Sequence, residues 1–390
     1  MSDPLNIRCF LGANQPPLTH GASMWRAPLP TRPFPTAAAG PNPGSITYGA
    51  YFEAVAAFVK SGRCRHLRQA AAAEMGHAVA FEDVTAVDIS LEKHGACYHP
   101  GRLAATVAGR RLTFVVNVAV SDAGRAGLAE EVACLRRLAG MYRERHLPTV
   151  YAAGRIRTAR GSWVEMFLAR WFDGFHEFHL TANGGRKAIR VWDAGNAVRL
   201  MTQEQAREMF SRAAAILTAY YDIKTSEQIF NWHHAAGDFV INTQDPVAVK
   251  LITVRRYAPL FRQAAVDAAG LLQSFLIFLL KTSLHMRIDR VDGTGVLGWF
   301  GDEAVYGTVD GFLQGLALQA AAGRIPAAWV AVVAEYLKTL AEADIRYLLR
   351  SIVEGRPAHA PDRPLLQQHL DQHVAVLKHA MDRIGPLDSL

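Results

Sequence analysis

Two imidazoles and one carboxylate stand close together near the middle of the chain. His233 and His234 are followed, after a small Ala-Ala-Gly step, by Asp238. Histidine and aspartate are common proton-transfer groups in catalysis. Two apolar runs follow the acid within residues 239–252, and a turn separates them. This pattern predicts a short hairpin, with Asp238 projecting from the loop that enters it.

Further histidines offer a second kind of chemistry, because imidazoles together with carboxylates can bind Zn²⁺, Fe²⁺ or Mn²⁺. Six of them fall in three short segments: His94, His99, His176, His179, His233 and His234. The spacing in His176-Glu177-Phe178-His179 differs from the His-Glu-x-x-His pattern of zinc enzymes. A divalent metal held by histidine therefore stands as one hypothesis, beside a structural role for the same side chains.

The amino-acid composition restricts the classes of protein that the chain resembles. The 390 residues are half hydrophobic and one fifth charged, which predicts a sizeable core. The net charge is +7, from 42 basic and 35 acidic residues, without a dense basic run. We therefore expect no nucleic-acid interface, and a mild preference for anionic small-molecule ligands.

Four separated cysteines and the absence of a Cys-x-x-Cys pair indicate a reducing compartment. The first residues lack a basic stretch followed by an apolar core, so we expect no signal peptide. The most apolar run, residues 271–280, is shorter than the ~20 residues of a membrane span and predicts a buried helix. A cytoplasmic protein without a membrane partner is the expectation.

The elements that must position these residues fall into four segments. Residues 1–44 hold nine of the eighteen prolines and predict a loop-rich or extended arm without regular helix, pinned to the body by Trp25 and Phe34. Residues 45–80 predict a helical extension, with helices at 46–60 and 62–76. Residues 81–172 predict three antiparallel strands, a helix and two more strands, at 85–91, 102–107, 112–120, 126–142, 147–151 and 162–172. Residues 173–390 read as mainly helical, with long helices at 203–221, 259–286, 302–321, 326–353 and 363–383.

This order resembles the protein-kinase-like superfamily, nearest its aminoglycoside and choline phosphotransferase branch. The resemblance covers roughly residues 80–320 and rests on order and spacing. It implies an α+β, bilobal fold, with a small lobe of five antiparallel strands and a larger helical lobe. It also implies an interlobe cleft that binds ATP with Mg²⁺.

In the small lobe, residues 93–101 resemble the phosphate-covering loop of that family, with Gly95 and Gly101 allowing close approach to phosphate. Asn117 stands where the family carries its phosphate-anchoring lysine, and asparagine supplies no positive charge. Glu131 resembles the helix glutamate that pairs with that lysine. The resemblance thus assigns Gly95, Gly101, Asn117 and Glu131 to nucleotide or phosphate binding.

In the helical lobe, Ala236-Gly237-Asp238 resembles the catalytic loop, which makes Asp238 the base and His234 a second catalytic residue. Asn242 follows four positions after Asp238, where the family places a metal-binding asparagine five positions later. Thr253 occupies the place of the metal-binding aspartate, and a neutral hydroxyl is a poor Mg²⁺ ligand. Arg255 is the expected phosphate ligand, and Asn242 with His233 are the expected metal ligands.

Three hypotheses therefore remain open. The chain is a divergent phosphotransferase that acts on a small hydroxylated substrate with ATP and Mg²⁺. Alternatively, it is a catalytically inactive pseudokinase that binds a ligand or a protein partner. The third hypothesis is an enzyme that depends on a histidine-bound divalent metal.

Overall fold

The computed structural model describes residues 5–12, 15–30, 46–95, 98–184, 186–192, 199–230, 235–261, 267–293 and 295–385. Two compact units make up the chain, Met1–Asp173 and Gly174–Leu390. Both contain helices and strands, so the fold class is α+β.

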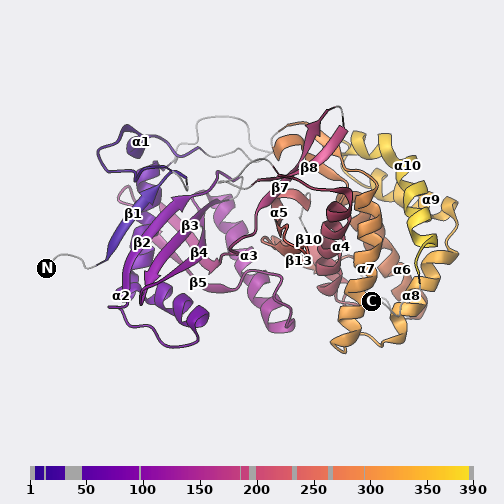
Figure 1. Ribbon diagram of the computed structural model, residues 1–390, viewed down its shortest axis with the longest axis horizontal. Coiled ribbons are helices and arrows are strands. Elements are labelled where there is room, and N and C mark those ends of the chain that lie inside the picture. The colour runs from indigo at the N-terminus through magenta and orange to yellow at the C-terminus, as the bar shows by residue number, and fades with distance from the viewer. Residues whose placement is uncertain are drawn as a thin grey trace. The chain divides into compact units, whose positions relative to one another are not determined.

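A six-stranded sheet forms the centre of the first unit, in the order β1-β2-β3-β4-β6-β5 (Figure 1). The strands are β1 Asn6–Phe10, β2 Val84–Leu91, β3 His99–Val107, β4 Arg110–Ala119, β5 Val150–Arg157 and β6 Trp163–Arg170. Neighbouring strands are antiparallel, except that β1 runs parallel to β2. The expected sheet of five antiparallel strands is therefore wrong: the sheet has six strands and is mixed.

The additional strand comes from the proline-rich segment 1–44, which we expected to be loop-rich or extended but did not assign to the sheet. Its Arg8 guanidinium donates from Nε and Nη2 to the two carboxylate oxygens of Asp88 on β2, at 2.7 and 2.8 Å. The same segment contains the short helix α1, Ser23–Arg26. Trp25 stacks on Phe52 with ring centroids 6.1 Å apart, as the prediction for Trp25 required. Phe34 lies outside the described residues.

Two helices pack on this sheet. Helix α2, Tyr48–Met75, begins where the Thr47 side chain accepts the Ala50 N–H, and non-helical residues 61–64 interrupt it. The two predicted helices therefore form one kinked element. Helix α3, Asp122–Met141, contacts β4, β5 and β6.

The alternation of β4 separates the two faces of the sheet, because successive side chains of a strand point to opposite sides. Phe114, Val116 and Val118 are fully buried in the core cluster that contains the α2 side chains. Asn117 therefore lies on the other face, where α3 packs. Among the described residues, its side chain makes no hydrogen bond.

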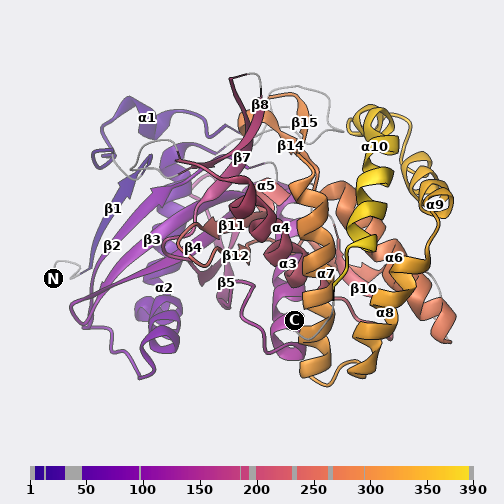
Figure 2. The same cartoon turned by 45° about the vertical axis from the view of Figure 1, so that its right-hand side comes forward.

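The second unit is built from helices and small sheets (Figure 2). The helices are α4 Gln203–Ala219, α5 Ala235–Asp238, α6 Ala268–His285, α7 Glu303–Ala321, α8 Ala328–Thr339, α9 Glu342–Glu354 and α10 Arg363–Asp382, with a 3₁₀ turn η1 at Val291–Gly293. The strands are β7 Glu177–Asn183, β8 Arg186–Trp192, β9 Arg199–Leu200, β10 Glu227–Phe230, β11 Phe239–Asn242, β12 Ala248–Leu251, β13 Arg256–Pro259, β14 Ile288–Arg290 and β15 Leu297–Trp299. They pair as one three-stranded sheet, β7-β8-β9, and three two-stranded sheets.

Two predictions for this unit need correction. The segment 173–202, read as part of a mainly helical region, contains the β7–β8 hairpin. The helix predicted at 326–353 is two helices, because Leu340 and Ala341 are extended, with ψ of 129° and 148°. The predictions at 302–321 and 363–383 agree closely with α7 and α10.

Helix α6 is apolar and 18 residues long, which is long enough to be a candidate membrane span. Half of it is buried inside the protein, and its buried residues include Phe275, Leu279 and Leu280. The buried helix predicted at 271–280 is thus confirmed as a core helix of the second unit, and the cytoplasmic location stays a prediction.

Candidate functional site

The predicted hairpin after Asp238 is present. β11 and β12 pair antiparallel, from Phe239 opposite Leu251 to Asn242 opposite Ala248. The Asn242 Oδ1 accepts the Gln244 N–H at 2.9 Å and so closes the turn between the strands. That bond gives Asn242 a structural role in the turn, beside the metal-binding role predicted for it.

Asp238 is the last residue of the short element α5 and is held by backbone geometry. The preceding Gly237 has φ of 86°, a left-handed conformation that glycine adopts without steric cost. The Asp238 carbonyl accepts the Ile252 N–H at 2.8 Å, which ties the residue to the far strand of the hairpin. The side chain is buried, and the residue is 3% exposed.

The Asp238 carboxylate forms an ion pair with Arg255. The distance from Oδ1 to the Arg255 Nη2 is 2.7 Å, and the arginine side chain is 29% exposed. This ion pair orients the Asp238 carboxylate toward Arg255 through one of its two oxygens. The predicted base, Asp238, and the predicted phosphate ligand, Arg255, therefore bind each other.

The metal site predicted from Asn242 and His233 stays a prediction, because one of its two ligands is not described. His233 and His234 lie outside the described residues. Within those residues, no group of three histidine, cysteine, aspartate or glutamate side chains is close enough to hold a metal ion.

His176 and His179 have local partners in the second unit. The His176 backbone exchanges two hydrogen bonds with Ile241, at 2.8 and 2.9 Å, and so extends the β11 pairing. The His179 Nδ1 lies 3.3 Å from Asp289, whose carboxylate also accepts the Leu180 N–H at 2.7 Å. The ring of His179 packs against Gly293, where a Cβ would lie 2.9 Å from Nε2. These contacts give His179 a structural role between β7 and β14.

The predicted phosphate-covering loop is shorter than expected. Gly101 is part of β3, paired with Val116, and a Cβ there would lie 2.6 Å from the Tyr51 hydroxyl. The absent side chain thus makes room for Tyr51 from α2. The Gly95 N–H donates to the Tyr98 carbonyl at 3.1 Å, so this amide is engaged in a turn. Both glycines have packing roles that spacing alone could not distinguish from phosphate binding.

The predicted helix glutamate is buried and has a partner that sequence reasoning missed. Glu131 is 0% exposed, and its Oε2 accepts a hydrogen bond from the Tyr98 hydroxyl. In kinases this position pairs with a lysine that contacts phosphate. Here the neutral Tyr98 hydroxyl, from the segment predicted to cover phosphate, donates a hydrogen bond to one oxygen of the carboxylate.

A hydrogen-bonded chain joins the same loop to α2. The Nδ1 atoms of His94 and His99 lie 3.2 Å apart, and the His94 Nε2 lies 3.1 Å from the Tyr48 hydroxyl. Burial, together with the neighbouring His94, lowers the pKa of His99 to about 4. At neutral pH His99 is therefore uncharged, and the two rings can share one hydrogen bond without repulsion.

Comparison with known proteins adds no assignment, because neither a protein-family model nor a curated protein matches the sequence.

Proposed function

We propose that this chain is a catalytically inactive, pseudokinase-type protein that acts by binding a ligand or a partner. The observation that carries the proposal is the buried ion pair between Asp238 and Arg255, 2.7 Å apart. A kinase-like phosphotransferase needs this aspartate to receive the proton of the acceptor hydroxyl. An aspartate held by a guanidinium in a buried position is instead suited to fixing the loop.

Three residues at positions that the kinase-like interpretation assigns to phosphate and metal binding, two in the first unit and one in the second, support the same proposal. Phosphoryl transfer relies on positive charge beside the phosphates and on a carboxylate-bound metal. Asn117 is neutral, Thr253 replaces the expected metal ligand, and Glu131 receives a tyrosine hydroxyl. Loss of one preorganised electrostatic group typically costs about 10²–10³ in rate, so three such changes together favour binding over catalysis. The kinase-like bilobal fold is part of this proposal, and it rests on element order: strands, a helix with a buried glutamate, then a hairpin that follows an aspartate.

A turnover assay separates this proposal from the phosphotransferase hypothesis. The full chain is incubated with ATP, Mg²⁺ and either choline or an aminoglycoside, and ADP release is measured. We expect the same background rate for the wild type, for Asp238→Asn and for the matched control Asp245→Asn in the hairpin turn. ADP release that requires Asp238 and survives the Asp245 change would overturn the proposal.

Thermal shift then examines binding. A ligand that binds the folded state stabilises it by RT ln(1 + [L]/Kd), which raises the melting temperature. Without a carboxylate that holds Mg²⁺, any stabilisation by ATP should be equal with Mg²⁺ and with EDTA. An ATP effect that appears only with Mg²⁺ contradicts the inactive assignment. A shift with Zn²⁺ or Mn²⁺ alone supports the histidine-metal hypothesis instead.

A further inference from the structure

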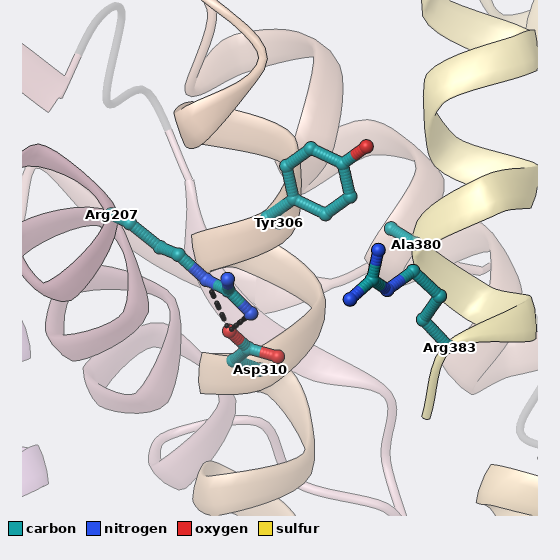
Figure 3. Close-up of a pocket in the computed structure, with 5 residues that line it drawn as sticks. All are labelled: Arg207, Tyr306, Asp310, Ala380 and Arg383. Carbon is teal, nitrogen blue, oxygen red and sulfur yellow. Dashed lines mark hydrogen bonds and ion pairs between the residues drawn. The ribbon is translucent and has the colours of Figure 1, made fainter. Parts of the chain in front are cut away.

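A polar pocket opens between three helices of the second unit (Figure 3). Its walls come from α4, α7 and α10, and its volume is about 340 Å³. That volume lies at the small end of ligand pockets, roughly 300–1,000 Å³. The residues that line it are Arg207, Tyr306, Asp310, Ala380 and Arg383.

Tight helix packing fixes the α4 and α7 walls. A Cβ on Gly307 would lie 2.4 Å from the Arg207 carbonyl oxygen, and one on Gly311 would lie 1.9 Å from the Ser211 carbonyl oxygen. The two backbones therefore touch, and only glycine permits that distance. Because the helices cannot slide apart without losing this contact, the side chains at their rim are held at a defined spacing.

The charges in the pocket are unequal. Arg207 donates from Nε and Nη2 to the same oxygen of Asp310, Oδ2, at 2.9 and 2.8 Å. Its guanidinium also lies over the Tyr306 ring, 5.6 Å from the centroid. Figure 3 shows the Arg383 guanidinium pointing from α10 toward α7. Within the described part of the chain Arg383 forms no ion pair, so two cations and one anion leave the pocket with an excess positive charge.

We propose that this pocket binds a phosphate group, either as free hydrogen phosphate or as a small phosphate monoester. Arg383 and the Nη1 of Arg207 supply donors to phosphate oxygens, which arginine recognises well. The second carboxylate oxygen of Asp310, Oδ1, accepts a P–OH proton, which free hydrogen phosphate keeps at neutral pH and which a monoester carries below its second pKa of about 6. Tyr306 adds an aromatic wall and a hydroxyl. The site does not depend on the kinase-like fold or on Asp238.

The aspartate makes the proposal selective, and this selectivity can be measured. Sulfate has nearly the same size and shape as phosphate, but it carries no proton at neutral pH. Sulfate has no proton to donate to the Asp310 carboxylate, and its negative charge is repelled by that carboxylate. Both effects oppose the binding of sulfate. Phosphate should therefore bind at least about tenfold more tightly than sulfate, which corresponds to ~1.4 kcal/mol.

Calorimetric titration of the full chain provides the test. The probes are inorganic phosphate, glycerol 3-phosphate and sulfate at pH 6.5, with ionic strength held constant because salt screens exposed charges. We expect saturable binding of phosphate and a weak response to sulfate. Tighter binding of glycerol 3-phosphate identifies a monoester as the ligand type, whereas tighter binding of inorganic phosphate identifies the free ion.

Three variants locate the binding in this pocket. Arg383→Gln should weaken phosphate about tenfold, the loss of one charge-assisted contact, and its exposure makes a folding defect unexpected. The matched control Arg350→Gln removes an exposed arginine of α9 and should leave affinity unchanged. Asp310→Asn should abolish the preference for phosphate over sulfate. The proposal fails if phosphate does not saturate, if sulfate binds equally to the wild type, or if the Arg383 and Arg350 variants lose affinity equally.

Discussion

The ion pair of Asp238 and Arg255 predicts an unequal response to mutation of its two members. The carboxylate side chain is 5% exposed, whereas that of the arginine is 29% exposed. Arg255→Gln leaves a buried negative charge without its guanidinium, and breaking a buried pair in this way costs about 3–5 kcal/mol. Because Arg255 already reaches water, the lower figure of ~3 kcal/mol is expected. Asp238→Asn removes the carboxylate charge from an arginine whose side chain already reaches water, so its cost should be about 1–2 kcal/mol.

The measurement is a double-mutant cycle by urea unfolding of the full chain. The cycle compares the wild type, the two single variants and the double variant Asp238→Asn/Arg255→Gln. The double variant should cost less than the sum of the singles by about 1–3 kcal/mol, because the second change removes a partner that is already lost. Arg350→Gln, which removes an exposed arginine of the same unit, should shift the midpoint by less than about 0.5 kcal/mol.

Two results would refute the reasoning. Strictly additive costs would mean that Asp238 and Arg255 do not interact in solution. A larger cost for Asp238→Asn than for Arg255→Gln would mean that the aspartate is held by other groups. In either case the structural role assigned to Asp238 fails, and its availability as a base has to be reconsidered.

Three further predictions concern packing, pH and a buried hydrogen bond. Gly311→Ala places a Cβ 1.9 Å from a carbonyl oxygen of α4 and should destabilise the folded state by about 1–3 kcal/mol. Gly127→Ala places a Cβ with no atom within 4 Å on helix α3 and should stabilise the folded state by about 0.5–1 kcal/mol. Equal melting temperatures of the two variants would contradict this. Burial lowers the pKa of His373 from 6.5 to about 3. Between these two pH values the imidazole is protonated in the unfolded state and neutral in the folded state. The unfolding free energy should thus fall by ~1.4 kcal/mol per pH unit at this site as the pH drops from 6.5 toward 3, and His373→Gln should flatten that decline; parallel pH curves of wild type and variant would exclude it. Tyr98→Phe removes a hydroxyl from the buried carboxylate of Glu131 and should lower the unfolding free energy by about 1–3 kcal/mol, and an unchanged urea midpoint would argue against the contact.

Local patterns predicted much of the first unit because its strands have one clear period. The alternation in residues 85–91 and the β-branched run in 112–120 predict β2 and β4 to within two residues at each end. β1 was missed, because its five residues carry little periodicity and their pairing depends on partners eighty positions away. The break between α8 and α9 was missed because apolar residues keep helical spacing across Leu340.

For the candidate site, sequence patterns located Asp238 and its hairpin but could not identify their partners. The hairpin follows from two apolar runs and a turn, which are local signals. The pairing with Arg255 depends on how the chain leaves β12, and no spacing rule encodes that. The role of a glycine is equally hard to infer from its position in the sequence, because phosphate-binding loops and close contacts with a helix both require glycine. Only the neighbouring Tyr51 explains why Gly101 lacks a side chain.

The parallel pairing of β1 with β2 also bears on the behaviour of the protein at high concentration. An uncovered strand presents unpaired amides and carbonyls that recruit strands of other molecules. β1 occupies that position beside β2, and the Arg8 contact to Asp88 fastens it there. Residues 6–10 therefore cover the edge of β2 and are themselves the edge strand of the sheet, so a variant that lacks them exposes the β2 edge to strands of other molecules.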